Sequence, residues 1–360
     1  MRTKDGRNPF RLGMSLGLFT LAASLILAGC SGTASTTGGE GAAKPAEGAK
    51  ALKVGVVFDR GGLGDKSFND SAWRGLQRAK TELGIEDAKV ESKEEKDYET
   101  NLSAMADQGM DLVIAVGINQ ASALKSVAPN YPDTKFAIVD GSVDLPNVRS
   151  LNFKEEEGSY LVGYAAGLAT KTGKVGFVGG MELPLIEKFY YGFKAGVMAA
   201  NPNAEVLAPK YTGSWDNVDT AKRMAEVLYD GGADVVYHAA GRAGLGVIRA
   251  AKERNLFAVG VDSDQDDEAP GNVLTSMIKR VDEAVFATIQ DLKNGSFSAG
   301  TKVYDFKSNG VGMSDMRHTK DKIGAENMAK IEEAKKAMAT MTDPIPFDTA
   351  SFNAWAAARK

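Results

Sequence analysis

The sequence predicts an α/β protein with two lobes, each built on a parallel β-sheet that carries helices on both faces. Short β-branched and apolar runs alternate with helical segments along the chain, beginning with Val54–Phe58. The chain contains 40 glycines, and several apolar runs end in glycine or aspartate, as tight turns between strands and helices do. The alternation falls into two series, and 360 residues are long for one core, so two lobes are expected.

The first series runs from Leu52 to about Thr170. It is expected to form strands at Val54–Phe58, Lys89–Glu91, Leu112–Val116, Phe136–Val139 and Val148–Phe153. The helices expected between them end near Leu83 or cover Tyr98–Gln108, Gln120–Ala128 and Glu156–Thr170. Ser67, Asn69 or Asp70 is expected to cap the first helix, because such side chains accept hydrogen bonds from free backbone N–H groups.

The second series begins at Lys174. Strands are expected at Val175–Val178, Glu205–Leu207, Asp234–Tyr237, Phe257–Val259 and Val273–Met277. Helices are expected at Leu185–Ala199, Val218–Tyr229, Ala243–Arg254 and Val281–Leu292, with an outer helix at Asn327–Met341. Strands that alternate with helices in this way form parallel sheets that are covered on both faces.

The N-terminal residues carry a targeting signal. Four basic side chains precede the apolar run Leu12–Ala28, which leads into Gly29-Cys30. Residues 1–29 resemble a bacterial lipoprotein signal peptide, which implies that Cys30 becomes the first residue of the mature chain and carries the lipid. The alternative is a membrane-spanning anchor. Residues 30–50 contain no large apolar side chain and are expected to form a flexible tether.

Composition narrows the possible functions. The formal net charge is -4 and no long basic block occurs, so we expect no nucleic-acid partner. Cys30 is the only cysteine, so the folded part has no disulfide and no catalytic thiolate. His238 and His318, the only histidines, lack partners at metal-ligand spacing, and Asp262–Asp266 lacks the glycine and glutamate of a calcium loop. We therefore expect no catalytic residue, no metal ion and no cofactor.

Three aspartates follow predicted strands in equivalent places. Asp59 and Asp140 lie in the first series and Asp262 in the second. A carboxylate at the carboxyl edge of a parallel sheet is placed to accept hydrogen bonds from a ligand. Any one of them alone is better explained as a helix cap or Asx turn, but three at equivalent positions favour a binding site.

Two aromatic residues lie just after turns and before helices, one in each series. Phe68 belongs to the first and Trp215 to the second. Such rings often pack into the core at the start of a helix. Rings supplied from opposite lobes can instead hold a flat ligand between them, at about 1 kcal/mol or more for each stack.

Two further features follow strands of the second series. The run from Gly241 to Gly246 is rich in glycine but is not a dinucleotide fingerprint, so we interpret it as a close backbone approach to a ligand. Lys279 is either an ordinary surface lysine or a donor to ligand oxygens.

Several motifs together resemble one protein family. They are VFDRGGLGDKSFND, PDTKFAIVDG at 132–141, VGFVGGMELPLIEKFYYGFKAGV at 175–197, YTGSWDN, HAAGRAGLG, VGVDSDQ and TSMIKR. On these motifs the chain resembles the basic membrane protein family of bacterial substrate-binding lipoproteins, also described as purine nucleoside receptors of ABC transporters. The resemblance runs from about Lys53 to Phe347. It implies a fold like that of type I periplasmic binding proteins, with two Rossmann-like lobes, three crossovers and a central ligand cleft.

The resemblance also implies a role for each candidate residue. Phe68 and Trp215 would stack on the two faces of a purine, although the family commonly has phenylalanine where this chain has Trp215. The base edge would be addressed by Asp59, Asn69 and Asp140. The ribose would be held by Gly241 or Gly244, together with Asp262 and Lys279.

The expected domain organisation follows from both kinds of reasoning. The N-terminal lobe is expected to comprise 51–172 and 271–299, the C-terminal lobe 173–270 and 300–347, and residues 348–360 a C-terminal tail. The protein would be a monomer, lipid-anchored at the extracytoplasmic face of the cell membrane. It would deliver adenosine, guanosine or inosine to ABC permease subunits. Two alternatives remain open: the same fold binding a sugar or other small polar solute, and a surface enzyme acting on nucleosides.

Overall fold

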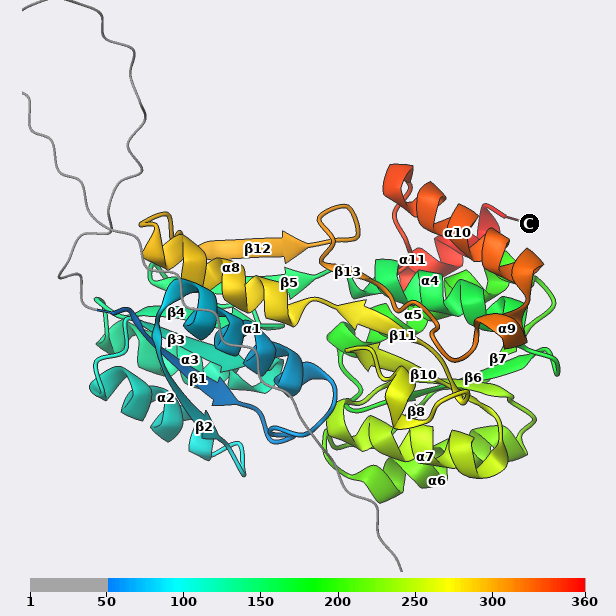
Figure 1. The fold of residues 1–360 in the computed structure, drawn as a ribbon, viewed down its shortest axis with the longest axis horizontal. Helices are drawn as coiled ribbons and strands as arrows, with labels where there is room; N and C mark the ends of the chain where they lie inside the picture. Colours follow the sequence, from blue (N-terminus) through cyan, green and yellow to red (C-terminus); the bar gives the residue numbers. More distant parts are fainter. Residues whose placement is uncertain (1–50, 360) are drawn as a thin grey trace, which may run out of the picture. The chain divides into compact units, whose positions relative to one another are not determined.

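Residues 51–359 are described in the computed structural model, and they contain two β-sheets with helices on both faces (Figure 1). The predicted signal peptide, the lipidated Cys30 and the tether lie outside the described residues. All but one of the strand pairs are parallel, so the α/β architecture predicted from the sequence is confirmed.

The first sheet has six strands in the order β12-β5-β4-β3-β1-β2. Their bounds are β1 (Lys53–Phe58), β2 (Glu86–Glu91), β3 (Leu112–Val116), β4 (Lys135–Val139), β5 (Val148–Phe153) and β12 (Gly300–Tyr304). The helices are α1 (Phe68–Leu83), α2 (Asp97–Asp107), α3 (Ala121–Val127) and α8 (Val281–Lys293). Neighbouring residues of β1 enter different cores: Val56 packs with α1 and α8, and Val57 packs with α2 and α3. This alternation is the two-residue period of a strand that is covered on both faces.

The second sheet has seven strands in the order β13-β11-β10-β9-β6-β7, with β8 also paired to β6. Their bounds are β6 (Lys174–Gly179), β7 (Glu205–Val206), β8 (Lys210–Tyr211), β9 (Val235–Ala239), β10 (Phe257–Asp262), β11 (Val273–Lys279) and β13 (Val311–Met313). Only β13 runs antiparallel to its neighbour. Helices α4 (Glu155–Ala169) and α5 (Pro184–Ala200) share one core with this sheet, and α6 (Val218–Asp230) and α7 (Leu245–Arg254) share the other.

The C-terminal helices extend the α4–α5 side of the second sheet (Figure 1). They are α9 (Lys320–Ile323), α10 (Ala325–Thr340) and α11 (Thr349–Ala357). Helix α10 contacts α4 and is the outer helix expected from the sequence. Helix α11 contacts α5, so part of the segment expected as a tail is an ordered helix.

The chain passes between the two sheets three times: from β5 to β6, from β11 to β12, and from β12 to β13. This path corrects the expected lobe boundaries. Strand β11, within 271–299, belongs to the second sheet, and β12, within 300–347, belongs to the first. The reason is that β12 is mostly exposed and polar, so the sequence shows no strand there.

The two sheets repeat one topology, which brings equivalent strand ends face to face. The order β2-β1-β3-β4-β5 in the first matches β7-β6-β9-β10-β11 in the second. Asp140 follows β4 and Asp262 ends β10, and both adopt a left-handed backbone with φ of 66° and 64°. Aspartate tolerates this conformation better than most residues do. Of the three aspartates singled out in the sequence, Asp140 and Asp262 are thus topological equivalents, whereas Asp59 follows β1, whose counterpart is β6.

Helices α4 and α5 pack backbone to backbone, because glycines line their contact. A Cβ atom on Gly196 would lie 2.0 Å from the carbonyl oxygen of Tyr160, and one on Gly192 would lie 2.4 Å from that of Glu156. A side chain at either position would push the helices apart. The close contact fixes the first turns of both helices, which carry Glu155 and Lys188.

Candidate functional site

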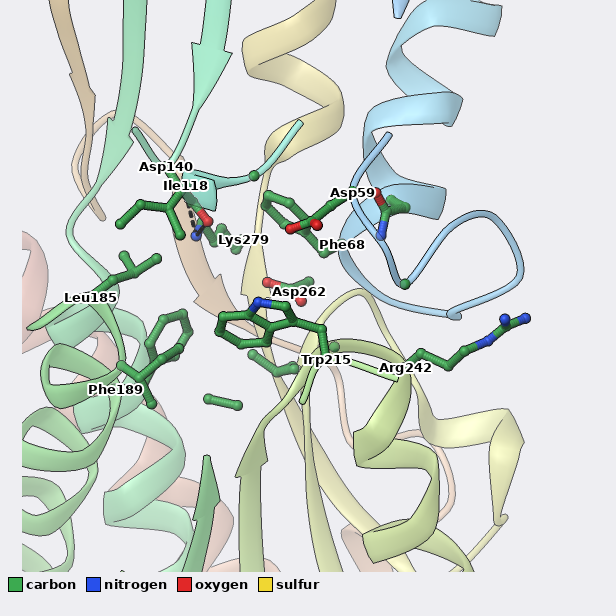
Figure 2. Close-up of a pocket in the computed structure, with 17 residues that line it drawn as sticks. Asp59, Phe68, Ile118, Asp140, Leu185, Phe189, Trp215, Arg242, Asp262 and Lys279 are labelled. Carbon is green, nitrogen blue, oxygen red and sulfur yellow. Dashed lines mark hydrogen bonds and ion pairs between the residues drawn. The ribbon is translucent and has the colours of Figure 1, made fainter. Parts of the chain in front are cut away.

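One cavity lies where the carboxyl ends of strands from both sheets meet (Figure 2). The volume of this cavity is about 60 Å³. The space is therefore a narrow slot. It is lined by Asp59, Gly61, Phe68, Asn69, Gly117, Ile118, Asp140, Leu185, Ile186, Phe189, Trp215, Ala239, Gly241, Arg242, Val261, Asp262 and Lys279.

Asp59 enters the slot from the end of β1 and is held from behind. The Tyr98 hydroxyl donates a hydrogen bond to its carboxylate, and the backbone N–H of Arg60 donates a second one at 2.6 Å. Burial raises the pKa of Asp59, and these two hydrogen bonds oppose the rise. Gly117 leaves room for the carboxylate, since a Cβ there would lie 2.5 Å from Asp59 Oδ2.

Phe68 and Asn69 begin α1 and are oriented by Asp65. The Asp65 carboxylate accepts hydrogen bonds from the backbone N–H groups of Ser67 at 2.9 Å, Asn69 at 2.7 Å and Asp70 at 3.1 Å. Asp65 therefore supplies the capping hydrogen bonds, and of the three expected N-cap candidates, Ser67, Asn69 and Asp70, only Ser67 occupies the N-cap position. Ser67 is the N-cap residue by position, but its side chain makes no capping bond.

Asn69, expected at the edge of a ligand's base, and Trp215, expected on its face, each keep a polar atom without a partner among the described residues. Asn69 donates its Nδ2 to Asp65 at 3.1 Å, which leaves Asn69 Oδ1 buried without a hydrogen-bond partner among the described residues. The indole Nε1 of Trp215 is also buried and finds no partner in the described part of the chain. A buried polar atom without a partner is costly, so both atoms are suited to bind a ligand.

Trp215 lies across the slot from Phe68, on the side of the second sheet (Figure 2). Its ring rests directly on Gly180, which follows β6. A Cβ at Gly180 would lie 2.3 Å from the six-membered part of the indole. The absence of a side chain there lets the large ring lie against the backbone and leaves the slot open above it.

Lys279 ends β11 and forms the polar floor of the slot. Its Nζ lies 2.6 Å from Asp140 Oδ1, 2.6 Å from Asp140 Oδ2 and 3.1 Å from Glu155 Oε1. Burial alone would lower the pKa of Lys279, but the carboxylates of Asp140 and Glu155 raise it overall, so the ammonium stays charged. Burial raises the pKa of Asp140 to about 6, with Lys279 opposing the rise.

Asp262 connects the two lobes at the slot. Its Oδ2 accepts a hydrogen bond of 2.5 Å from the Ser67 hydroxyl, and Ser67 belongs to the loop before α1. Burial raises the pKa of Asp262 to about 7, while Lys279 and the Ser67 hydrogen bond oppose the rise. Near neutral pH this side chain therefore exists in both protonation states, and it can accept or donate a hydrogen bond.

Eight of the nine expected ligand-binding residues line the slot: Asp59, Phe68, Asn69, Asp140, Trp215, Gly241, Asp262 and Lys279. Gly244 does not. It packs against the buried His238 ring, where a Cβ would lie 1.9 Å from Nδ1. Gly244 is therefore a packing position, and of the two glycines expected near a ribose only Gly241 borders the slot.

Several lining residues were not anticipated from the sequence. Leu185 and Phe189 come from the first turns of α5, and Arg242 follows β9 with its guanidinium directed away from the slot (Figure 2). A signal for α5 was present, because an aromatic-rich helix follows β6 at the same sheet edge as the other candidates. The supporting side chains Tyr98 and Glu155 gave no sequence signal, since they contact the site residues only through the fold.

The remaining polar candidates are engaged elsewhere. His238 Nε2 lies 3.0 Å from Gln265 Oε1, and burial lowers the pKa of His238 to about 4. Arg317 forms an ion pair with Asp267, directly after the run rejected as a calcium loop, and His318 Nε2 lies 2.8 Å from the other carboxylate oxygen of Asp267. Among residues 51–359, no group of three histidine, cysteine or acidic side chains is placed to hold a metal ion.

The arrangement is suited to binding a planar, uncharged, hydroxylated molecule. Rings from both lobes supply flat apolar walls, and the polar groups sit at the slot's edges and floor. Two parallel-sheet lobes around such a slot define the class of solute-binding proteins with the type I periplasmic fold. The structure is similar to that of an ABC transporter solute-binding protein from Aeropyrum pernix K1. The two compare with a TM-score of 0.75 and 29% identity, over 84% of this chain and 96% of that chain.

The comparison of sequences narrows the class to one family. A family model described as "ABC transporter substrate-binding protein PnrA-like" matches residues 52–346, and the chain belongs to this family, Bmp. It is similar to a protein of Listeria innocua named "CD4+ T-cell-stimulating antigen", with 38% identity over 92% of this chain and 98% of the relative. It is also similar to "ABC transporter nucleoside-binding protein BmpA" of Lactococcus lactis, with 35% identity over 83% of this chain and 90% of the relative.

The protein is thus an ABC transporter substrate-binding protein, as the sequence motifs had indicated. Within residues 51–359, no helix combines the length and the apolar character that crossing a membrane requires.

Proposed function

We propose that this protein captures a purine nucleoside in the slot between Phe68 and Trp215 and presents it to the permease of an ABC importer. The observation that carries the proposal is the pairing of two aromatic walls with two unpartnered polar atoms, Trp215 Nε1 and Asn69 Oδ1. A purine base is flat and carries both acceptors and donors at its edge, which matches one free donor and one free acceptor. The name of the Lactococcus lactis relative supports the same ligand class.

The polar residues of the slot fall into two groups, one that binds the edge of the base and one that binds the ribose. Asp59, Asn69 and Asp140 address the base edge, while Gly241 and Asp262 address the ribose. Carboxylates accept hydrogen bonds from hydroxyls and amines but repel phosphate, so a nucleoside fits this site better than a nucleotide does.

Lys279 acts mainly on Asp140. Its ammonium has three N–H groups, and the contacts with Asp140 and Glu155 occupy most of them. It fixes the direction of the Asp140 carboxylate and has at most one donor left for a ribose oxygen.

Closure of the lobes converts binding into a signal for the permease. In this structure the lobes contact each other at the slot. The Ser67 hydroxyl donates to Asp262, and the Ser263 hydroxyl donates to the Ser67 carbonyl at 2.9 Å. Arg60 and Asp216 form an ion pair at 3.8 Å. A ligand that contacts both lobes gains its full binding energy only when they are closed, so it shifts the population towards the closed form. The permease would recognise that form, and no bond is broken.

The proposed location rests on the N-terminal sequence. Cleavage before Cys30 and lipidation of its sulfur would anchor the protein at the extracytoplasmic face of the cell membrane, with 30–50 as the tether. The protein would act there as a monomer. Replacing Cys30 by alanine should release it from the membrane fraction, and unchanged membrane association would contradict the anchor.

Calorimetric titration of the purified full chain in mild detergent tests the ligand. Adenosine, guanosine, inosine, cytidine, ribose and galactose would be compared, and tight binding of at least one purine nucleoside is expected, with Kd around 1 μM or below. If ribose or galactose bound with a Kd of about 1 μM or below and no nucleoside bound, the proposal would be overturned in favour of a sugar receptor. Analysis of the recovered nucleoside by chromatography separates capture from catalysis, because an enzyme would return a cleaved product.

A further inference from the structure

A second cavity opens directly beside the slot. The two cavities adjoin at Asp140 and Leu185, which line both of them. The volume of the second cavity is about 550 Å³, compared with about 60 Å³ for the slot. The slot holds a flat group closely, and the neighbouring cavity has room for a substituent.

The charges around the second cavity favour a cation. Glu187 and Asp348 line it, and neither carboxylate forms an ion pair with any residue in 51–359. Its only lining cation is Lys188, which donates to Glu155 Oε2 at 2.9 Å and to the Phe153 carbonyl at 2.9 Å. The free charges on its walls are therefore negative, and Lys188 has little capacity left for an anion.

One wall of this cavity is supplied by the C-terminal segment, beyond the family match that ends at 346. Phe347 and Asp348 line the cavity directly before α11. The Asp348 carboxylate caps that helix by accepting from the Ser351 backbone N–H at 2.7 Å, and Phe352 packs on Tyr191 of α5 with ring centroids 5.7 Å apart. The segment is held in place on α5, the helix that also carries Glu187.

We propose that the second cavity is a subsite for an amine-bearing substituent of the solute held between Phe68 and Trp215. The ammonium group would lie between Glu187 and Asp348, and the carbon atoms next to it would contact Phe347 and Leu185. The proposal rests on the proposed function, since it takes the planar part of the ligand to be a nucleoside. The subsite would extend the expected solutes from plain nucleosides to nucleosides that carry an amine. It would favour a positively charged substituent over a neutral one.

Matched ligand pairs test the subsite by calorimetry at low salt. One pair is N6-(2-aminoethyl)adenosine and N6-(2-hydroxyethyl)adenosine, and the other is N6-(3-aminopropyl)adenosine and N6-(3-hydroxypropyl)adenosine, because the base edge is the part of the ligand placed at Asp140. In at least one pair the amine should bind fivefold or more tightly, and the gain should shrink as sodium chloride screens the carboxylates. Glu187→Gln should abolish the gain while the affinity for adenosine stays unchanged.

The control variant is Glu182→Gln, which removes the same charge from an exposed position outside both cavities and should leave the gain intact. Equal affinity within both pairs, or a gain that survives in Glu187→Gln, would overturn the subsite while leaving nucleoside capture standing. Failure of every nucleoside to bind would overturn both proposals together.

Discussion

Lys279 Nζ lies 2.6 Å from each carboxylate oxygen of Asp140, so an ion pair joins the end of β4 in the first sheet to the end of β11 in the second. The lysine side chain is 1% exposed and the aspartate side chain 8% exposed. The rings of Phe68 and Phe153 lie around the ammonium, with their centroids 5.4 Å and 5.0 Å from Nζ. The floor of the slot is therefore a charge pair in an almost dry surrounding, shared by both lobes.

Replacing Lys279 by methionine should destabilise the protein by about 3–5 kcal/mol, because it leaves buried carboxylates without their counter-charge. Urea unfolding measured at pH 7 checks this value. The double variant Lys279→Met with Asp140→Asn should recover part of the loss, since it also removes one of those carboxylates. A loss below about 1 kcal/mol in the single variant would contradict the role given to the pair.

Replacing Gly180 by alanine should weaken nucleoside binding tenfold or more, because the new methyl group would occupy the space of the Trp215 ring. The displaced indole should also change its fluorescence in the free protein. Gly312→Ala is the matched control, since a Cβ there meets nothing within 4 Å and the backbone φ is not positive. Unchanged affinity in Gly180→Ala would show that the position of Trp215 is not important for the ligand.

Tyr98→Phe should weaken nucleoside binding about threefold to tenfold and more strongly at lower pH. The change removes the hydroxyl that donates to Asp59 and opposes the rise in the pKa of that carboxyl. The Asp59 pKa should rise further, so its ionised form is lost at a higher pH than in the unchanged protein. Affinities measured from pH 5 to pH 8 check this.

Tyr131→Phe is the control for that experiment, because it removes a tyrosine–aspartate hydrogen bond of 2.8 Å at the surface, between two residues that do not line the slot. Its binding curve should coincide with that of the unchanged protein. If Tyr98→Phe gave the same curve as Tyr131→Phe, Asp59 would not depend on Tyr98.

Most of the fold could be predicted from the sequence because the buried strands are recognisable as short apolar runs. Leu112–Val116 and Phe136–Val139 are continuous apolar runs, as is typical of strands covered on both faces. Strand β12 was missed because Gly300–Tyr304 is mostly exposed at a sheet edge, where nothing requires apolar residues. The lobe boundaries failed with it, since they depend on which sheet each late strand joins.

The site residues that lie at strand ends could be predicted from the sequence. The side chains that hold them in place from other helices and strands could not. Asp140 and Asp262 follow strands directly, so the sequence places them at one edge. Glu155 reaches Lys279 because α4 packs against β11, a relationship between a helix and a distant strand that sequence spacing does not contain. Lys279 was expected to be either a surface lysine or a donor to ligand oxygens, and its contacts with the carboxylates of Asp140 and Glu155 became visible only in three dimensions.

Glu156→Gln should stabilise the protein at neutral and higher pH. Glu156 lies in the first turn of α4 with Oε2 buried and without a hydrogen-bond partner among the described residues. Burial raises its pKa to about 7, while Lys188, at 4.0 Å, opposes the rise. Because the folded-state pKa lies above the unfolded value, the protonated glutamate stabilises the fold below about pH 4.5, and this contribution is lost as pH rises through 7.

Glutamine stays neutral, so the stability difference between Glu156→Gln and the unchanged protein should grow with pH. Between pH 5 and pH 8 it should change by on the order of 1–3 kcal/mol, measured by urea unfolding. Asp262 and His238 titrate in both proteins and cancel in the difference. Glu99→Gln, an exposed change of the same kind in the first turn of α2, is the matched control to be measured beside Glu156→Gln. A flat difference for Glu156→Gln would mean that Glu156 is ionised in the folded protein throughout this range, with Lys188 compensating fully for its burial.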